Sequence, residues 1–304
     1  MILVTGATGT VGGHVVSALK ERGAAIRVGR RSPEDASDDE DESTSAERPE
    51  SRTPVGVSRR NVDDLEVVAF DYEKPETWGS ALTGVEAVFV LRPAGIDADT
   101  IERFVAAAGR SGVSRVVYLS GIGADWNPLN SHFYSERRVA DADVAHTVLR
   151  ASYFMQNLRD IHRRDVAERG EVFVPAGGGA VSFVDARDIG AVAATALTES
   201  GHENRAYDVT GPSALDFEAV AAVFTDVLDR EITYPNPSLL SFARRLRGRG
   251  ASLGDVAFLG SIYTAARLGM ADRVSEDVER VLERRPRSLR DFVADNADAF
   301  RPES

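Results

Sequence analysis

Residues 1–31 read MILVTGATGTVGGHVVSALKERGAAIRVGRR, and this stretch decides the fold. Ile2 to Thr5 form a short apolar run of the kind that a buried parallel strand shows. Ala25 to Val28 supply a second strand after Gly23, which ends a helix. That helix is predicted from an apolar pattern at Val11, Val15, Val16 and Leu19. The sequence therefore predicts a complete βαβ unit.

Three glycines, Gly6, Gly9 and Gly12, stand three residues apart at the junction between the first strand and the helix. There the backbone must turn tightly and offer free N–H groups, at the positive end of a helix, to a pyrophosphate. A glycine-rich turn alone is a weak signal, because such turns are common in α/β proteins. Inside a βαβ unit it is specific, and it predicts a dinucleotide-binding site.

The end of the second strand indicates which dinucleotide is bound. A site for NAD usually has an acidic residue about 20 residues beyond the glycines, which binds the ribose 2′-hydroxyl. Here the strand ends in Gly29, Arg30 and Arg31 instead. A guanidinium suits a 2′-phosphate, so we predict NADPH in preference to NADH. The alternative is that Arg30 and Arg31 are solvated surface residues.

The length of 304 residues allows one large domain, or one domain with a smaller lobe. No stretch approaches 18 consecutive apolar residues, so no membrane partner is expected. The chain starts directly in a predicted core strand, which predicts no signal peptide and a cytoplasmic location. The sequence has no cysteine, which excludes disulfides, thiolate catalysis and cysteine-ligated metals.

The charge is strongly one-sided, with a net value of −12. All 36 basic residues except Lys20 and Lys74 are arginine. Acid excess with arginine in place of lysine resembles the proteomes of salt-loving archaea, in which concentrated salt screens self-repulsion. An ordinary acidic mesophilic protein is the alternative. In either case the charge argues against nucleic acid as a partner, since that needs a basic surface.

Strands and helices alternate along the first half of the chain, apart from the acidic stretch 32–60, which we predict to be a mobile insertion. The alternation predicts an α/β fold with a doubly wound parallel Rossmann sheet. After Arg150 the pattern is mostly helical and predicts a smaller C-terminal substrate lobe, in which Tyr153 to Met155 lead into a helix that ends at about Arg169. We assign 1–152 and 181–210 to the dinucleotide-binding domain, and 153–180 and 211–304 to the lobe.

Ligands of such sheets bind beyond the carboxyl ends of the strands. The residues that follow the predicted strands are therefore the candidates for the site. They are Asp71-Tyr72, Arg92 to Gly95, Ser120-Gly121 and the residues from Arg150 onward.

Several long motifs carry a resemblance to a known family. TGATGTVG looks like the TGxxGxxG fingerprint of the short-chain dehydrogenase/reductase superfamily. Together the motifs resemble the NmrA-like group of atypical members over nearly the whole chain except the acidic stretch. That group includes NADPH-dependent quinone and azo-dye reductases, and redox sensors that bind the nucleotide without turnover. The motifs are TGATGTVGGHVV (5–16), GVEAVFVLRP (84–93), VVYLSGIGA (116–124), HTVLRASYFMQNL (146–158), VSFVDARDIGAVAATAL (181–197) and RPRSLRDFVADNADAF (285–300).

The resemblance implies a set of cofactor-binding residues. Arg30 and Arg31 would hold the 2′-phosphate, and Asp71 would reach the adenine. The ribose and nicotinamide would lie against Arg92, Pro93 and Ala94. The pyrophosphate would be held by Gly6, Thr8, Gly9, Thr10, Val11 and Gly12.

The resemblance also implies a substrate pocket walled by Tyr153, Phe154, Met155 and Asn157. Alternatively, the aromatic residues only pack the core between the two parts and Asn157 caps a helix. His132 and Glu136 resemble the family's His/Lys-xxx-Glu pattern beside the nicotinamide.

The candidate catalytic residues are Ser120, His132, Tyr134 and Arg138. Ordinary short-chain dehydrogenases use a serine and a Tyr-x-x-x-Lys pair to protonate a carbonyl, and this chain has Ser120 and a Tyr-x-x-x-Arg at Tyr134 and Arg138. The alternative is that Tyr134 is a partly exposed helix residue and that Ser120 only ends a strand. Quinone reduction does not need that acid, because water or His132 can supply protons. The histidines show no metal-ligand spacing, and His14 and His146 are expected to be structural, so no metal is predicted.

We therefore expect an NADPH-dependent oxidoreductase that transfers hydride to a quinone-like or other small electrophilic substrate. One alternative is a non-catalytic NADP(H) sensor. A weaker one is a sugar-nucleotide epimerase-like enzyme, which should have kept the lysine. The sequence leaves open whether the chain is a monomer or a homodimer.

Overall fold

A computed structural model describes residues 1–31 and 65–302, so the predicted acidic insertion at 32–60 lies outside the described residues. Within the described residues, a parallel sheet of seven strands forms in the order β3-β2-β1-β4-β5-β6-β8. This arrangement confirms the predicted Rossmann sheet. The strands are β1 (Ile2–Val4), β2 (Ile26–Arg30), β3 (Glu66–Ala69), β4 (Ala87–Leu91), β5 (Arg115–Gly121), β6 (Ala145–Ala151) and β8 (Arg205–Val209).

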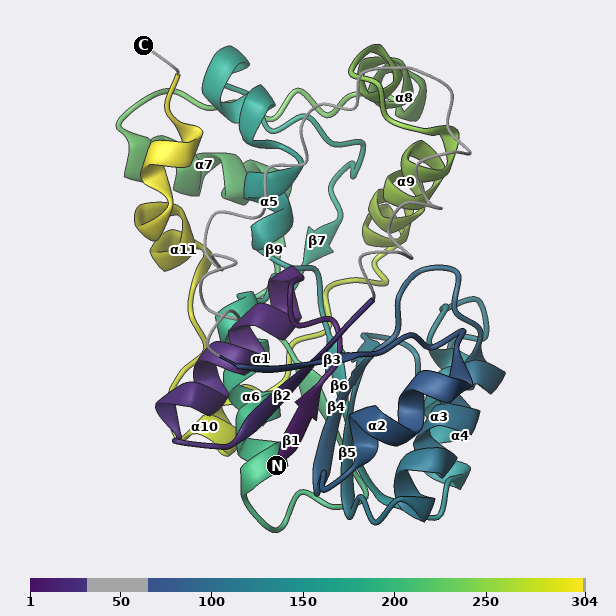
Figure 1. The fold of residues 1–304 in the computed structure, drawn as a ribbon. Coiled ribbons are helices and arrows are strands. Elements are labelled where there is room, and N and C mark those ends of the chain that lie inside the picture. The colour runs from purple at the N-terminus through teal and green to yellow at the C-terminus, as the bar shows by residue number, and fades with distance from the viewer. Residues whose placement is uncertain (32–64, 303–304) are drawn as a thin grey trace.

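Helices cover both faces of the sheet (Figure 1). Side chains of a strand alternate between the faces, so Ile2 and Val4 belong to one apolar core and Leu3 to the other. The first core is shared with α1 (Thr10–Glu21), α6 (Ala186–Thr198) and α10 (Asp277–Leu282). The second is shared with α2 (Trp78–Leu82), which follows the short 3-10 turn η2 (Pro75–Thr77), and with α3 (Ala98–Arg110) and α4 (Phe133–Asp141).

The strand order reverses between β1 and β4, and in such sheets this is where a crevice for ligands opens. The buried Thr5 hydroxyl fixes the edge of that crevice. It donates to the Phe89 carbonyl at 2.9 Å and accepts from the Leu91 N–H at 2.9 Å and the Tyr72 hydroxyl at 3.0 Å. One side chain therefore joins the segments that follow β1 and β3 to strand β4.

A smaller, mostly helical lobe stands over the carboxyl ends of the strands (Figure 1). It has its own apolar core, in which Phe217, Phe242 and Tyr263 are fully buried. Its helices are α5 (Gln156–Asp160), α7 (Phe217–Leu228), α8 (Leu239–Gly248), α9 (Leu253–Arg267) and α11 (Leu289–Asp295), with a π-helical turn η3 (Asp165–Arg169), a 3-10 turn η4 (Ala297–Phe300) and a small antiparallel sheet of β7 (Ala180–Val181) and β9 (Leu215–Asp216).

Two elements of this half differ from the prediction. The helix predicted to follow Met155 and to end at about Arg169 is interrupted, because the chain forms the short α5 and then the wider turn η3, which ends at Arg169. That turn carries the buried Asp165 carboxylate to the guanidinium groups of Arg245 and Arg249, at 2.8 and 2.6 Å. Helix α10, which we assigned to the lobe, packs instead on the sheet domain, since Val278 is buried in the first core.

Candidate functional site

The glycine-rich turn after β1 has a conformation that side chains would prevent. Gly6 has φ +66°, in the left-handed region, and its carbonyl accepts from the Gly9 N–H at 3.0 Å. A Cβ at Gly12 would lie 2.1 Å from the Gly6 carbonyl oxygen. The spacing of the glycines therefore allows the first turn of α1 to lie directly against the end of β1.

The N-terminus of α1 is left open for an anion. Helices α3, α6 and α7 are each capped by an aspartate side chain (Asp97, Asp185 and Asp216). At α1 the capping position is Gly9, which has no side chain, and the first turn has no acidic residue. The free N–H groups and the helix dipole can then bind a negative group, and this cradle fits a pyrophosphate.

The residues proposed for the adenosine half follow the neighbouring strands. Arg30 and Arg31 are exposed at the end of β2, the strand beside β1. Asp71 follows β3, where its carboxylate accepts from the Glu73 N–H at 2.9 Å and its carbonyl from the Trp78 indole N–H at 2.8 Å. These contacts fix the Asp71 backbone at the same edge of the sheet as the glycine turn.

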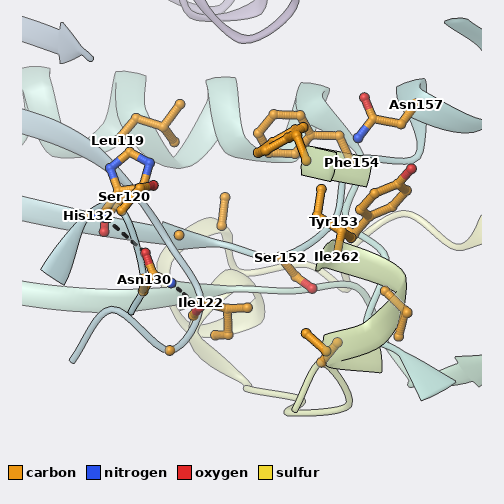
Figure 2. A pocket seen from close by; sticks show the side chains of 18 of the residues that line it. Leu119, Ser120, Ile122, Asn130, His132, Ser152, Tyr153, Phe154, Asn157 and Ile262 are labelled. Atoms are coloured by element: carbon orange, nitrogen blue, oxygen red, sulfur yellow. Dashed lines mark hydrogen bonds between the residues drawn. The ribbon is translucent and has the colours of Figure 1, made fainter. Parts of the chain in front are cut away.

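A cavity of about 650 Å³ extends from this turn into the smaller lobe (Figure 2). Of the residues predicted for the site, the cavity brings eight together: Thr10, Val11, Arg92, Ser120, His132, Tyr153, Phe154 and Asn157. Pro93 and Ala94 are exposed beside it and do not line it. The cavity therefore connects the nucleotide turn with the lobe.

Arg92 and His132 form a polar corner of the cavity. The Arg92 guanidinium donates to the carbonyls of Ile96 and Ser131, at 2.5 and 2.9 Å, while its Nε is buried without a partner in the described residues. The His132 Nδ1 lies 2.8 Å from the Tyr118 hydroxyl. Burial, and then the positive charge of Arg92, lower the pKa of His132 to about 4, so its ring is neutral at pH 7.

Asn130 fixes the loop that carries His132. Its amide oxygen accepts from the His132 N–H at 2.9 Å, and its amide nitrogen donates to the Ile122 carbonyl at 3.0 Å, as Figure 2 shows. The ring of His132 is thereby held at the start of α4, beside the end of β5.

The predicted group of Ser120, Tyr134 and Arg138 is not assembled, and this prediction is wrong. Helix α4 turns Ser135, Glu136 and Val139 toward the core, so Tyr134 is 59% exposed and lies outside the cavity lining. Arg138 pairs at the surface with Asp99 and Glu102, at 3.2 and 3.3 Å.

Ser120 is bound by a different partner, the buried Glu136. Its hydroxyl donates to the Glu136 carboxylate at 2.5 Å, and Arg150 binds the same carboxylate through Nε and a terminal nitrogen, at 3.0 and 2.8 Å. Arg150 also lies 3.7 Å from the Asp125 carboxylate, which forms a second ion pair with Arg273 at 3.1 Å. Ser120 thus joins an ion-pair network beneath the cavity and can still present its oxygen to a ligand.

The predicted substrate wall is brought together in part. Tyr153, Phe154 and Asn157 line the cavity, but Met155 does not, because it is buried in the core of the lobe. That correction follows from the backbone. Residues 154–155 pair with Val184, and Phe154 and Met155 therefore face opposite sides of the short bridge.

The sequence reasoning missed part of the wall. The loop after β5 contributes Ile122 and Trp126, and α9 with the segment after it contributes Phe258, Ile262 and Met270. Position just after a strand could have indicated the loop residues. Nothing local marks the α9 residues, which reach the cavity only because the lobe folds over the sheet.

The described residues contain neither a group of metal ligands nor a membrane-spanning helix. Among residues 1–31 and 65–302, no three or more side chains of His, Asp or Glu are grouped so that they could hold a metal ion. In the same ranges, none of the helices combines the length and the apolar character that crossing a membrane requires.

Comparison with known proteins adds to this geometry. The NmrA-like family profile matches residues 1–246. The chain belongs to the NmrA-like family. It is 33% identical to the NAD(P)H azoreductase of Xenophilus azovorans over 307 residues, which cover 99% of each chain. The predicted family membership is thereby confirmed, and so is the expectation of an oxidoreductase.

Solved structures show the same fold. The quinone oxidoreductase QOR2 of Escherichia coli, complexed with NADPH, is 25% identical and has a TM-score of 0.80, with 98% of this chain and 100% of that chain covered. The triphenylmethane reductase of Citrobacter sp., complexed with NADP(H), is 24% identical and has a TM-score of 0.81, with 98% and 100% covered. Family, fold and open phosphate turn together support binding of a nicotinamide dinucleotide.

Proposed function

We propose that this protein is an NADPH-dependent reductase that transfers hydride to a quinone-like or other small electrophilic substrate held in the 650 Å³ cavity. The observation that carries the proposal is the continuity of this cavity, which joins the first turn of α1 to a wall from the lobe. When bound, NADPH would supply the hydride from C4 of its nicotinamide. The azoreductase and quinone oxidoreductase relatives have activities of this class.

The preference for NADPH rests on Arg30 and Arg31. Both are exposed at the end of β2, at the sheet edge where Asp71 would reach the adenine. A guanidinium at this place favours a 2′-phosphate, because the bond is charge-assisted and a hydroxyl offers no such charge. NADH lacks that phosphate and would bind more weakly.

The wall of the cavity favours a flat, uncharged substrate. Phe154, Trp126, Phe258 and Ile262 offer apolar and aromatic surface, and among residues 1–31 and 65–302 none of the lining side chains is acidic. Aromatic faces bind flat rings well, and such a wall suits a ring-shaped apolar substrate.

Within this scheme, the chain divides its work between its two parts. Residues 1–152 and 181–210 would bind the dinucleotide, with α10 packed beneath, and 153–180 with most of 211–304 would bind the substrate. Arg92, which lines the cavity, would hold the nicotinamide end. Ser120 and the neutral His132 would hydrogen-bond the substrate side.

The test is single-turnover oxidation of enzyme-bound NADPH by a panel of benzoquinones, naphthoquinones and azo dyes. The proposal predicts that the absorbance of bound NADPH at its nicotinamide band disappears with at least one member of the panel, faster than with free NADPH. If NADPH binds tightly and no member oxidises it, the reductase proposal is wrong.

One observation favours a second candidate, a non-catalytic NADP(H) sensor. The acid group of ordinary short-chain dehydrogenases is not assembled here, since Tyr134 and Arg138 lie on the exposed face of α4. Different affinities for NADP⁺ and NADPH, together with no turnover, would favour this sensor over the reductase.

A further inference from the structure

A chain of three buried polar groups runs from the cavity wall into the lobe. The Tyr153 hydroxyl lies 2.8 Å from the Tyr263 hydroxyl, which in turn bonds the His162 Nε2 at 2.5 Å. Tyr153 lines the cavity, while Tyr263 and His162 are each only 1% exposed. The three residues come from the segment after β6, from α9 and from the segment after α5, so the fold brings them together over about a hundred positions of sequence.

The surroundings of this chain are apolar. Tyr263 packs edge-on against Phe217 and Phe242, with ring centroids 5.9 and 5.5 Å apart. In an apolar core, each polar group of such a chain needs a hydrogen-bond partner. Phenylalanine in place of the tyrosines would pack equally well without that requirement. Its position at the cavity therefore suggests a role in the reaction.

All three groups are neutral at pH 7. Burial lowers the pKa of His162 to about 4, although the nearby Asp165 works in the opposite direction. Burial also raises the pKa of Tyr153 to about 12 and that of Tyr263 well above its usual range. A neutral imidazole has one protonated nitrogen, so the tautomer of His162 decides in which direction the hydrogen bonds run.

If Nε2 carries the proton, His162 donates to Tyr263, and Tyr263 donates to Tyr153. Asn157 also lines the cavity, and Figure 2 shows its side chain beside the Tyr153 ring. With Tyr263 donating to it, the Tyr153 hydroxyl does not spend its own proton on Tyr263, and that proton can be donated into the cavity. With the proton on Nδ1, the chain would run the other way and Tyr153 would have nothing to donate.

We propose that Tyr153 is the acid that protonates the substrate, and that Tyr263 and His162 are positioning residues that relay the proton to it. This inference rests on the proposed reductase function. The substrate gains a hydride from bound NADPH and a proton from Tyr153: the Tyr153 O–H bond breaks and a substrate O–H or N–H bond forms. The Tyr263 proton moves to Tyr153, and the Nε2 proton of His162 moves to Tyr263 while Nδ1 takes up a proton from solvent, so the imidazole stays neutral. Proton exchange with solvent then returns the ring to the Nε2-protonated tautomer.

The first test does not depend on turnover. Nitrogen-15 NMR of the full chain, with the His162 signals assigned by H162Q, reports which ring nitrogen is protonated. The relay predicts the Nε2-protonated tautomer in the wild-type chain and a changed His162 signal in Y263F. A ring protonated at Nδ1 contradicts the relay, whether or not the protein reduces any substrate.

The second test uses single-turnover reduction of menadione by bound NADPH, in H₂O, D₂O and their mixtures. Y153F is expected to slow the reaction about 100-fold and Y263F about tenfold, with unchanged NADPH affinity. The wild-type rate should depend on the deuterium fraction along a curve, because several protons move together, and Y263F should lose that curvature. A role in packing alone would change neither the solvent isotope effect nor its shape.

Two control variants separate the possible outcomes. Y234F removes a hydroxyl of the same lobe that bonds the Gly177 carbonyl at 3.0 Å, outside the chain, and it should leave the rate unchanged. H132Q tests the competing donor. If H132Q removes the solvent isotope effect while Y263F keeps it, the relay is wrong. If the wild-type chain binds NADPH but reduces neither menadione nor any member of the quinone and azo-dye panel, the reductase proposal and the relay are both wrong. If the wild-type chain does reduce a substrate and Y153F and Y263F reduce it at the same rate, only the relay is wrong.

Discussion

The two ends of the cavity are built in opposite ways. At the nucleotide end, a turn of backbone does the binding, and its shape depends on glycines within seven residues of one another. At the substrate end, side chains from the loop after β5, the segment after β6 and α9 meet across the molecule. At the nucleotide end, a Cβ at Gly12 would collide with the backbone. The substrate end depends on buried ion pairs and hydrogen bonds between residues that are far apart in the sequence.

The largest effect that sharpens this contrast is expected at the glycine turn. In G12V the new Cβ would lie 2.1 Å from the Gly6 carbonyl oxygen, so the backbone of the turn must move. We expect NADPH affinity to fall more than about 100-fold, which corresponds to about 3 kcal/mol, measured by fluorescence titration. G79A is the control, because nothing lies within 4 Å of its added Cβ. Unchanged binding by G12V would contradict the proposed turn.

Next in size is the ion pair beneath the cavity. E136A leaves Arg150 without its bidentate partner and Ser120 without its acceptor. Removing one partner of a buried pair costs about 3 to 5 kcal/mol of unfolding free energy, measurable by urea denaturation. R138A, on the same helix but at the surface, should cost less than about 1 kcal/mol. Equal losses in the two variants would mean that Glu136 is not buried as described.

The buried imidazoles give a pH-dependent effect at the substrate end. His132 and His162 ordinarily titrate near pH 6.5, and in the folded chain their pKa values are lowered to about 4 by burial. The unfolded chain therefore binds protons between these values that the folded chain does not. The free energy of unfolding should be fully present above pH 6.5 and fall as the pH goes from 6.5 to 4, by about 3 kcal/mol for each ring.

Urea denaturation of the wild-type chain and H162Q across this pH range measures the effect. In H162Q, the free energy of unfolding should no longer show the fall with decreasing pH that is due to His162. The fall that is due to His132 should remain. A slope that is the same in both chains would show that His162 titrates in the folded protein as it does in water.

The smallest effect concerns the choice of cofactor. R30A should raise the Kd for NADPH about tenfold and leave that for NADH unchanged, because only the 2′-phosphate meets this guanidinium. Titration of both nucleotides measures it, with R110A on the far end of α3 as a control of equal charge change. A parallel loss for NADPH and NADH would show that Arg30 acts through general charge and not at the phosphate.

The same contrast explains how much the sequence could predict. The βαβ unit with its glycine turn and the alternation of strands and helices follow from short-range spacing, and the structure has them as predicted. The prediction that Tyr134 and Arg138 act with Ser120 failed because a four-residue spacing shows only that two side chains share a helix face. Which face meets the core is decided by Ser135, Glu136 and Val139.

The parts that could not be predicted depend on contacts between distant segments. Only the family resemblance singled out Glu136, and no local pattern shows that its carboxylate is bound by Arg150 and Ser120. Tyr263 and His162 stand about a hundred positions apart and show no motif. The π-helical turn at Asp165 places the carboxylate against Arg245 and Arg249, and no pattern near Asp165 in the sequence predicts these two ion pairs.

The central claim is that one continuous cavity holds the nicotinamide and the substrate in a fixed orientation. The direct test is single-turnover reduction of menadione with NADPH deuterated at C4, using the 4R and 4S isotopomers separately. The account predicts that only one of the two labels slows the reaction, because the substrate meets one face of a held nicotinamide. Equal slowing by both labels, or a rate no faster than that of free NADPH, would contradict it.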